Sequence, residues 1–306
     1  MTIIISGENV ADLLPAESGR LRVALGGGPA NTAVAVARLG GEVSFAARFG
    51  SDAFGQAFRD RLSAAGVDLS HAARVEAPSS LAVASLDASG AASYDFWLNG
   101  AADFAATDLP APEPGDIQHI GSLAAYWQPG ADVAERWITD NPNPGTVTVT
   151  LDVNLRPLVL ERQPDAITRL ERLVQRADVV KASDDDLHLA YPNTDPAITA
   201  RTWLELEQGP SLVVLTLGAG GVLGLTRDAR RVHVPAPKVD VVDTIGAGDA
   251  AMGALLTELA SSSVAEVCDN LEATLRFTVA VAALACTKAG AYAPTADEVA
   301  AHFSAA

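Results

Sequence analysis

Cysteine is scarce in this sequence. The two that occur, Cys268 and Cys286, lie in segments with helical patterning. Neither they nor the five scattered histidines show the spacing of a zinc site or of a disulfide framework. We therefore expect a protein of a reducing compartment, the cytoplasm.

Basic residues are also few. Lys and Arg together number 21 against 38 Asp and Glu, which gives a net charge of −17. Because no basic stripe is present to neutralise phosphates, neither a nucleic acid nor an anionic membrane surface is expected as a partner. An anionic substrate must instead be bound locally, by backbone amides, an arginine or a metal ion.

Long hydrophobic runs are missing as well. The longest, roughly residues 277–286, is too short to span a bilayer, and the segment MTIIISGENV lacks the basic region and long apolar core of a signal peptide. No internal repeat or low-complexity linker occurs. The chain has 306 residues, 49% hydrophobic and 19% charged, and we expect one globular domain, residues 1–306, with a substantial core.

What the sequence contains is an alternation of short apolar segments and longer amphipathic ones. The predicted strands are residues 3–6, 43–47, 117–120, 147–153, 179–181 and 212–217. The predicted helices are residues 30–39, 53–65, 133–140, 166–176, 197–207, 248–259 and 271–288. Strands that recur between helices, several of them apolar on both faces, predict a doubly wound α/β fold with a mostly parallel sheet and helices on both faces.

Two stretches break this alternation. Residues 10–25 and 80–98 have strand character without helices between, and Asp87-Ala88-Ser89-Gly90 in the second has the composition of a hairpin turn. They predict a small β-sheet lid, inserted at about residues 10–25 and 80–105, over the edge of the main sheet.

Residues 239–256 read VDVVDTIGAGDAAMGALL and place two carboxylates, Asp243 and Asp249, on either side of a turn of small residues. A β-branched run precedes the turn and helix formers follow it, so the turn opens a helix whose first N–H groups have no partner within the helix. Glycines there allow close backbone approach, and the helix dipole favours negative charge. The pattern predicts an anion site beside a carboxylate.

Two other patterns could account for parts of this stretch. Asp243 or Thr244 alone could cap the helix. Gly246, Gly248 and Ala251 also satisfy G-x-G-x-x-A, but no strand ending in an acid follows, because the next long segment is helical and Ala-rich. The phosphate-binding pattern G-x-x-x-x-G-K-[ST] is absent from the sequence.

The string DTIGAGD, residues 243–249, resembles the D-T-x-G-A-G-D signature of the ribokinase/PfkB family of sugar kinases. The resemblance implies a ribokinase-like fold and transfer of a phosphoryl group from ATP, with Mg²⁺, to a sugar. It also implies that the amides of Gly246, Ala247 and Gly248 form an anion hole and that Asp249 is the general base.

Two N-terminal motifs resemble sugar-binding segments of the same family. The segment GGGPANTAVAVARLG, residues 26–40, implies substrate contacts for Gly27, Gly28 and Asn31. The segment GENVADLLP resembles the G-E-x-x-x-D start of fructokinase-like members, with Asp12 accepting hydrogen bonds from sugar hydroxyls. The alternatives are a glycine turn before a core helix and a solvated aspartate at a strand edge.

The segment LDVNLRP, residues 151–157, follows a predicted central strand. Its Asp152, Asn154 and Arg156 match the D-x-N-x-R element of fructokinases and 2-keto-3-deoxygluconate kinases. The resemblance implies sugar binding by Asn154 and Arg156, because ligands of doubly wound sheets bind beyond the carboxyl ends of the strands. The alternative is an arginine paired with a neighbouring loop.

Nucleotide binding is implied for a set of residues near two further strands. These residues are Lys181, Ser183, Thr216, Gly218, Gly220 and Gly221. The family usually carries N-x-x-E where this chain has Ser183 and Asp186, so Asp186 is the implied Mg²⁺ ligand, directly or through water, with Asp184 or Asp185 as substitutes.

The segment ACTKAGAYAP resembles the family's C-terminal nucleotide and cation loop. It implies a monovalent-cation (K⁺) site built mostly from backbone carbonyls. Its residues are Asp243, Ile245, Ala285, Lys288 and Gly290.

Fructose is the favoured sugar, because GGGPAN, SYDFWLNGAAD (residues 93–103) and DVNLRP together resemble fructokinases. The alternatives are a 2-keto-3-deoxygluconate kinase, with Arg156 facing the carboxylate, a ribokinase or other sugar or nucleoside kinase, and an inactive sugar- or nucleotide-binding protein. Phe96, Trp97 and Leu98 predict apolar lid surface and hence a homodimer through the lid.

Overall fold

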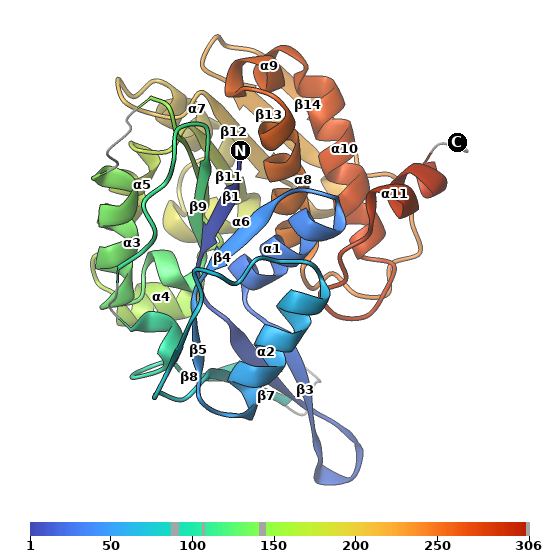
Figure 1. Cartoon of the computed structure of the whole chain (residues 1–306). Coiled ribbons are helices and arrows are strands. Elements are labelled where there is room, and N and C mark those ends of the chain that lie inside the picture. The colour runs from blue at the N-terminus through green and yellow to red at the C-terminus, as the bar shows by residue number, and fades with distance from the viewer. Residues whose placement is uncertain (87–91, 106–107, 141–144, 304–306) are drawn as a thin grey trace.

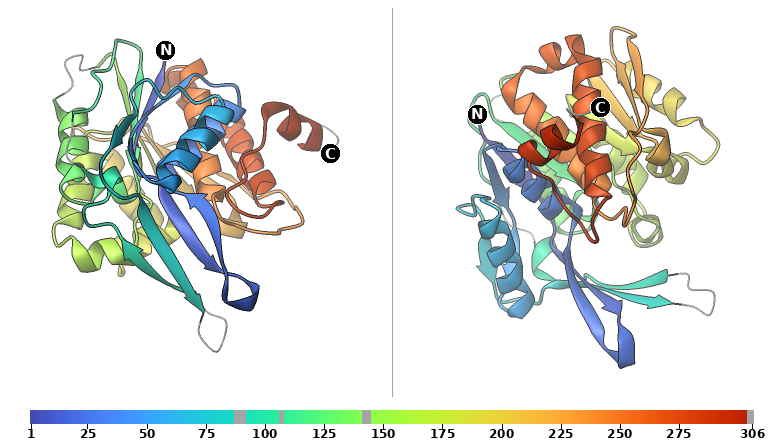
Figure 2. Two further views of the ribbon diagram at one scale, coloured as in Figure 1. Left: turned by 60° about the horizontal axis from the view of Figure 1, so that its bottom comes forward. Right: turned by 90° about the vertical axis from the view of Figure 1, so that its right-hand side faces the viewer.

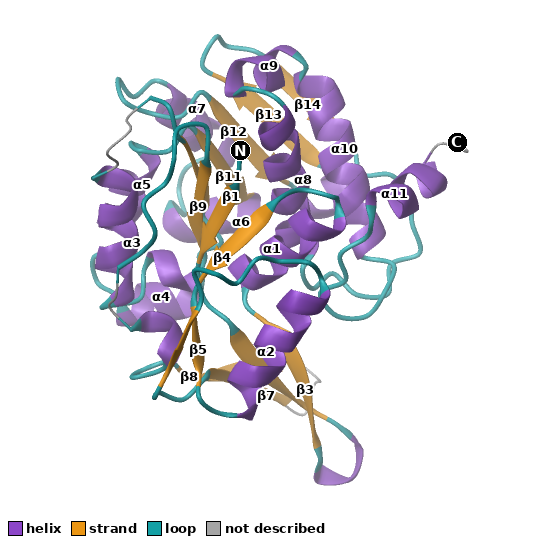
Figure 3. Ribbon diagram, in the orientation of Figure 1, coloured by secondary structure: helices purple, strands orange, loops and turns teal. Residues whose placement is uncertain are grey.

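The structure is a computed structural model that describes residues 1–86, 92–105, 108–140 and 145–303 (Figure 1). The predicted turn at Asp87-Ala88-Ser89-Gly90 lies outside these residues. The described part consists of one large sheet between two layers of helices and a second, smaller sheet that extends from the edge of this body (Figures 1 and 3).

The large sheet has eight strands in the order β14-β13-β12-β11-β10-β9-β1-β4. The bounds of the parallel strands are β1 (Ile3–Ser6), β4 (Val43–Ala46), β9 (Ile117–Gly121), β10 (Thr148–Asp152), β11 (Val179–Ser183) and β12 (Leu212–Thr216). They confirm the six strands predicted from the sequence. The antiparallel strands β13 (Val222–Thr226) and β14 (Arg231–Val234) extend the sheet beyond β12.

Alternate residues of the parallel strands pack on opposite faces. Ile4 of β1 belongs to the core on one face, whereas Ile3 and Ile5 belong to the core on the other. The first face is covered by α3 (Gly130–Thr139), α4 (Pro157–Arg162), α5 (Ala166–Val174), α6 (Asp184–Ala190) and α7 (Pro196–Leu204). The second is covered by α1 (Gly28–Arg38), α2 (Ala53–Ala64), α8 (Ala247–Ser261), α9 (Val264–Asp269) and α10 (Leu271–Ala285). The two-faced burial that the apolar strands predicted is therefore confirmed.

The helices differ from the prediction in number and length. All seven predicted helices form, but α4, α6, α9 and α11 (Ala296–Phe303) were not predicted. Helix α10 ends at Ala285 rather than at 288, because the carbonyl of Cys286 accepts the amides of Val242 and Asp243, at 2.8 and 3.2 Å. The chain before α8 therefore takes the place of a further helical turn.

The smaller sheet is the predicted lid. Its strands are β2 (Val10–Pro15), β3 (Leu21–Gly26), β7 (Ser80–Leu86) and β8 (Ala92–Trp97), in the order β3-β2-β7-β8. Strands β2 and β7 pair in parallel and the outer pairs are antiparallel. Figure 2 shows the lid strands extending away from the main body. A separate pair, β5 (Arg48–Gly50) and β6 (Ala73–Val75), joins the chain on either side of α2.

Among the described residues, no helix is both long enough and apolar enough to cross a membrane.

Candidate active site

The carboxyl ends of five parallel strands open into one cleft. The residues at these ends that line it are Glu8 after β1, Ser122 after β9, Asn154 after β10, Ser183 of β11 and Thr216 of β12. The chain reverses its direction of strand addition at β1, with β4 on one side and β9 on the other, as expected of a ligand-binding crevice. The cleft has a volume of about 1690 Å³ and exceeds the usual size of a site for one small ligand.

Helix α8 points its first turn into the cleft. Gly246 precedes it with φ of 79°, and a Cβ on this residue would lie 2.8 Å from the Cα of Ala291, so only glycine fits. Gly246, Ala247, Gly248 and Asp249 all line the cleft. The amide of Ala247 donates to the carbonyl of Thr244 over 3.2 Å, a long bond that closes the turn.

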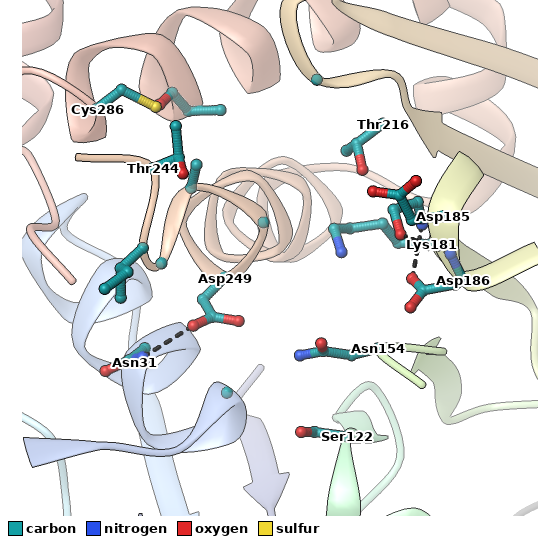
Figure 4. Close-up of a pocket in the computed structure, with 18 of the residues that line it drawn as sticks. Asn31, Ser122, Asn154, Lys181, Asp185, Asp186, Thr216, Thr244, Asp249 and Cys286 are labelled. Atoms are coloured by element: carbon teal, nitrogen blue, oxygen red, sulfur yellow. Dashed lines mark hydrogen bonds between the residues drawn. The ribbon is translucent and has the colours of Figure 1, made fainter. Parts of the chain in front are cut away.

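Asp249 is 9% exposed. Its Oδ2 accepts a hydrogen bond of 2.8 Å from Nδ2 of Asn31, which lies on α1 (Figure 4). Burial raises the pKa of the Asp249 carboxyl, and the Asn31 bond together with the charges of Lys181, Arg156 and Arg61 opposes this rise. Figure 4 shows Asn154 and Ser122 across the same space from Asp249.

Gly28, at the start of α1, lies close to both Asn154 and Asp249. A Cβ on Gly28 would lie 2.7 Å from Nδ2 of Asn154 and 3.3 Å from Oδ1 of Asp249. A larger residue would therefore displace one of these polar side chains. Both Gly27 and Gly28 line the cleft.

The lid contributes one wall of the cleft. Asp12 on β2 lines it together with Tyr94 and Phe96 on β8. Burial raises the pKa of Asp12 to about 6, although the charge of Arg156, which lines the same cleft, lowers it. Asp12 and Arg156 are thus brought together although they are distant in the sequence.

Lys181 and Asp152 form a buried ion pair on neighbouring strands. The distance from Nζ of Lys181 to Oδ1 of Asp152 is 2.7 Å. Burial raises the pKa of Asp152 to about 6, and the attraction of Lys181 opposes it. Lys181 lines the cleft, whereas Asp152 does not.

Asp186 and Ser183 cap α6 reciprocally. The amide of Asp186 donates to Oγ of Ser183 at 3.0 Å, and the amide of Ser183 donates to Oδ2 of Asp186 at 2.8 Å. The other oxygen, Oδ1, accepts the amide of Leu155 at 2.8 Å. Asp186 therefore holds the loop that carries Asn154, whose φ of 35° lies in the left-handed region.

A magnesium ion bound to nucleotide phosphates requires only one or two protein carboxylates. Within the described ranges no group of three or more His, Cys, Asp or Glu side chains is arranged to hold a metal ion. Direct coordination by Asp186 would replace hydrogen bonds to backbone amides. Asp184 and Asp185 also line the cleft, and these carboxylates fit a metal that arrives with the nucleotide.

Several residues assigned from the sequence do not line the cleft. Of the implied nucleotide-binding residues, Thr216, Gly218 and Gly221 line the cleft, but Gly220 does not. The carbonyl of Gly220 instead accepts a hydrogen bond from His233 Nε2. Of the proposed monovalent-cation residues only Ile245 lines it; the others are Asp243, Ala285, Lys288 and Gly290.

Asp243 instead joins two loops. It accepts the amide of Ile245 at 3.0 Å and the amide of Gly290 at 2.8 Å. The loop before α8 is thereby tied to the loop after α10, the two segments that the cation resemblance paired.

Sequence reasoning missed several cleft residues. These are Glu8, Tyr94, Phe96, Ser122, Cys286 and His302. Glu8 is 1% exposed, accepts the amide of Ala124 at 2.9 Å, and has its pKa raised by burial to about 7. Its place in the GENVAD motif was a usable signal. Ser122 and His302 lie in segments without a motif.

Comparisons with known proteins identify the family of this chain. Residues 5–298 match the family model described as pfkB family carbohydrate kinase. The chain is similar to a fructokinase of Salmonella typhimurium, with 34% identity over 290 residues that cover 94% of each chain.

Two solved structures are also similar. A fructokinase of Xylella fastidiosa with bound ATP has a TM-score of 0.88 and 32% identity, covering 99% of this chain and 98% of that one. An aminoimidazole riboside kinase of Salmonella enterica, complexed with aminoimidazole riboside and an ATP analog, has a TM-score of 0.86 and 27% identity, covering 98% of this chain and 99% of that one. The chain therefore belongs to the pfkB family of carbohydrate kinases and is an ATP-dependent sugar kinase.

Proposed function

We propose that this sugar kinase transfers the γ-phosphoryl group of ATP to a hydroxyl group of fructose, with Asp249 as the general base. The observation that carries the proposal is a buried carboxylate at the start of α8, bonded to Asn31 and facing a cleft large enough for two substrates. Phosphoryl transfer depends on positioning and charge stabilisation more than on covalent chemistry with the protein, and this arrangement supplies both.

Asp249 accepts the proton of the attacking sugar hydroxyl. The hydroxyl oxygen forms a bond to the γ-phosphorus as the bond between that phosphorus and the bridging oxygen breaks, and ADP leaves. The charges of Lys181, Arg156 and Arg61 favour the ionised form of Asp249 that this role requires.

The amides of Gly246, Ala247 and Gly248 stabilise the phosphoryl oxygens at the positive end of the helix. The Ala247 amide exchanges its 3.2 Å bond to Thr244 for a bond to the phosphoryl group. Mg²⁺, when bound, neutralises charge on the nucleotide phosphates. Asp184 and Asp185 would hold it, with Asp186 taking part through water.

The sugar binds between the lid and the start of α1. Its proposed contacts are Asp12, Gly27, Gly28, Asn31, Asn154 and Arg156, all of which line the cleft. The nucleotide binds at the β11 and β12 ends, where Lys181, Ser183, Thr216, Gly218 and Gly221 line the cleft and Gly220 shapes the turn. On α10, Val279, Ala282 and Ala283 offer an apolar wall to its base. Asp243, Ile245, Ala285, Lys288 and Gly290 remain a proposed K⁺ site.

A 2-keto-3-deoxy sugar acid is the second candidate substrate. Arg156 lines the cleft, and the planar fork of a guanidinium matches a carboxylate with two parallel hydrogen bonds. The similarity to a riboside kinase also leaves other sugars to be tested, because one fold supports many substrates.

The deciding experiment measures ADP release from ATP and Mg²⁺ with fructose, 2-keto-3-deoxygluconate, ribose and adenosine. Fructose should give the highest kcat/KM. A higher value for any other acceptor would overturn fructose as the substrate and leave the kinase reaction standing. Binding of ATP without ADP release for any acceptor would indicate an inactive binding protein.

We further infer that the chain forms a homodimer through the lid. Side chains alternate along each lid strand, so the face opposite the cleft carries Leu21, Val23 and Trp97. These three are 53%, 45% and 57% exposed. The sequence expectation changes in detail, since Leu98 is buried and Phe96 lines the cleft, which leaves Trp97 as the exposed member of that triplet.

A further inference from the structure

Arg61 reaches the active site from behind the cleft. It lies on α2 and does not line the cleft, but its Nη2 donates to Oδ1 of Asn31 at 2.7 Å. Its Nη1 donates to the carbonyl of Leu25 on lid strand β3 at 2.9 Å. Two bonds in different directions fix the plane of the guanidinium.

The hydrogen bond from Arg61 determines which atom of the Asn31 amide faces Asp249. A guanidinium has donors and no acceptor, so it must face the amide oxygen of Asn31. The amide nitrogen then points the other way, and Nδ2 donates to Oδ2 of Asp249 at 2.8 Å. Were the amide to turn over, its oxygen would face a carboxylate and repel it.

Other charged groups act on Asp249 without this directionality. Lys181 on β11 and Arg156 after β10 favour its ionised form through charge, and Lys181 is itself paired with Asp152 on β10. Asp152 carries the same sign of charge as Asp249 and repels it. Asn31 is the side chain whose hydrogen bond opposes the effect of burial on Asp249.

We propose that Arg61 is a positioning residue for the base: it fixes the orientation of the Asn31 amide and so keeps Asp249 oriented and ionised. This inference rests on the proposed role of Asp249. It makes α2 and the lid strand β3, to which Arg61 is also bonded, part of the support of the catalytic carboxylate.

The test compares Arg61→Ala with Arg59→Ala, a matched control on the same helix. The guanidinium carbon of Arg59 lies 5.4 Å from the centre of the Phe49 ring, a contact of a different kind. The first readout is the titration of Asp249 in the ligand-free protein, followed by carboxyl ¹³C NMR. Its resonance is identified as the one missing from Asp249→Asn.

In Arg61→Ala the titration midpoint of Asp249 should rise by about one pH unit, the scale set by losing a hydrogen bond to a charged group. The acid limb of kcat/KM should move upward by the same amount, because activity requires the ionised base. ATP affinity should stay unchanged, and Arg59→Ala should match the wild type in all three measurements. A midpoint unchanged in Arg61→Ala would overturn the inference.

A double-variant comparison separates the hydrogen-bonded relay from simple charge. In an Asn31→Ala background, Arg61→Ala should shift the Asp249 midpoint by less than half of its effect in the wild-type background. An equal shift in both backgrounds would mean that Arg61 acts by charge alone, which contradicts the positioning role. If Arg61→Ala does not fold, Arg61→Met, which keeps the apolar stem, decides by the same criteria.

Failure of the proposed function gives a different result. Near-normal turnover of Asp249→Asn would remove Asp249 as the base, while the ligand-free titration would still report whether Arg61 controls its ionisation. An Asp249→Asn variant without turnover, combined with unshifted Arg61 variants, would overturn only the inference about Arg61.

Discussion

Nζ of Lys181 lies 2.7 Å from Oδ1 of Asp152, and both side chains are buried. Neighbouring strands β10 and β11 pair these two residues directly in register. The pair therefore holds a positive charge near Asp249, the proposed base, where it opposes the effect of burial on the pKa of that carboxyl group.

Removing the cation from this pair should destabilise the fold in a pH-dependent way. Lys181→Met leaves a buried carboxylate unpaired, which costs about 3–5 kcal/mol when that carboxylate is ionised. Because the pKa of Asp152 is already raised to about 6 by burial, protonation should reduce the loss at pH 5.5 relative to pH 8. Urea unfolding at both pH values measures this, with Lys181→Met/Asp152→Asn as the control that restores neutrality. An equal loss at both pH values would contradict the role assigned to the pair.

Glu8 should make the ligand-free protein less stable at alkaline pH. Burial raises its pKa from 4.5 to about 7, so the folded protein holds an extra proton between these values. The destabilising contribution is therefore fully present above pH 7 and disappears as the pH falls towards 4.5.

Glu8→Gln keeps an acceptor for the Ala124 amide and removes the charge. It should stabilise the protein by on the order of 1–3 kcal/mol at pH 8 and far less at pH 5. Glu42→Gln, a change at an exposed glutamate, should be neutral at both. Chemical unfolding of the three proteins decides, and a Glu8→Gln protein less stable than the wild type at pH 8 would refute the expectation.

Asp186 should act as a cap and loop anchor rather than as a direct metal ligand. Asp186→Ala leaves the amides of Ser183 and Leu155 without their partner and should cost about 2–4 kcal/mol of stability. The Mg²⁺ concentration for half-maximal activity should rise only slightly in Asp186→Ala and Asp186→Glu, because Asp186 takes part through water, and should rise more in Asp185→Ala. A rise in Asp186→Ala as large as that in Asp185→Ala would identify Asp186 as a direct ligand.

The proposed lid dimer should be sensitive to a charge placed on the outer lid face. Trp97→Asp should convert dimer to monomer in sedimentation velocity at micromolar concentration. Ile198→Asp is the matched control, since Ile198 is 60% exposed on α7 and lies outside the lid. A wild-type protein that sediments as a monomer would refute the dimer outright.

The sequence predicted the scaffold well because its signals are local. Apolar runs of strand length gave the six parallel strands, and the DTIGAGD segment opens α8 as its glycines indicated. The nucleotide turn and the cation loop could not be predicted from local sequence, because their contacts join residues that are distant along the chain. The carbonyl of Gly220 pairs with His233, and the Asp243 carboxylate accepts the backbone amide of Gly290.

Tertiary contacts explain most of what the sequence could not predict. Arg61 occupies an ordinary position of an amphipathic helix, and only the packing of α2 beside α1 brings it to Asn31. Ser183 and Asp186 stand where the family usually has N-x-x-E, and they also have the spacing of a capping box. In the structure they form the capping box. Asp186 reaches Leu155 only because β10 and β11 are neighbours.

The turnover of Asp249→Asn decides whether Asp249 is the base. This change preserves size and the start of α8 but removes the proton acceptor, so kcat should fall by about 10²–10⁴-fold. ATP affinity should change little, because the amides of Gly246, Ala247 and Gly248 belong to the backbone. A folded, ATP-binding Asp249→Asn protein whose kcat stays within about tenfold of the wild type would contradict the assignment of Asp249 as the base.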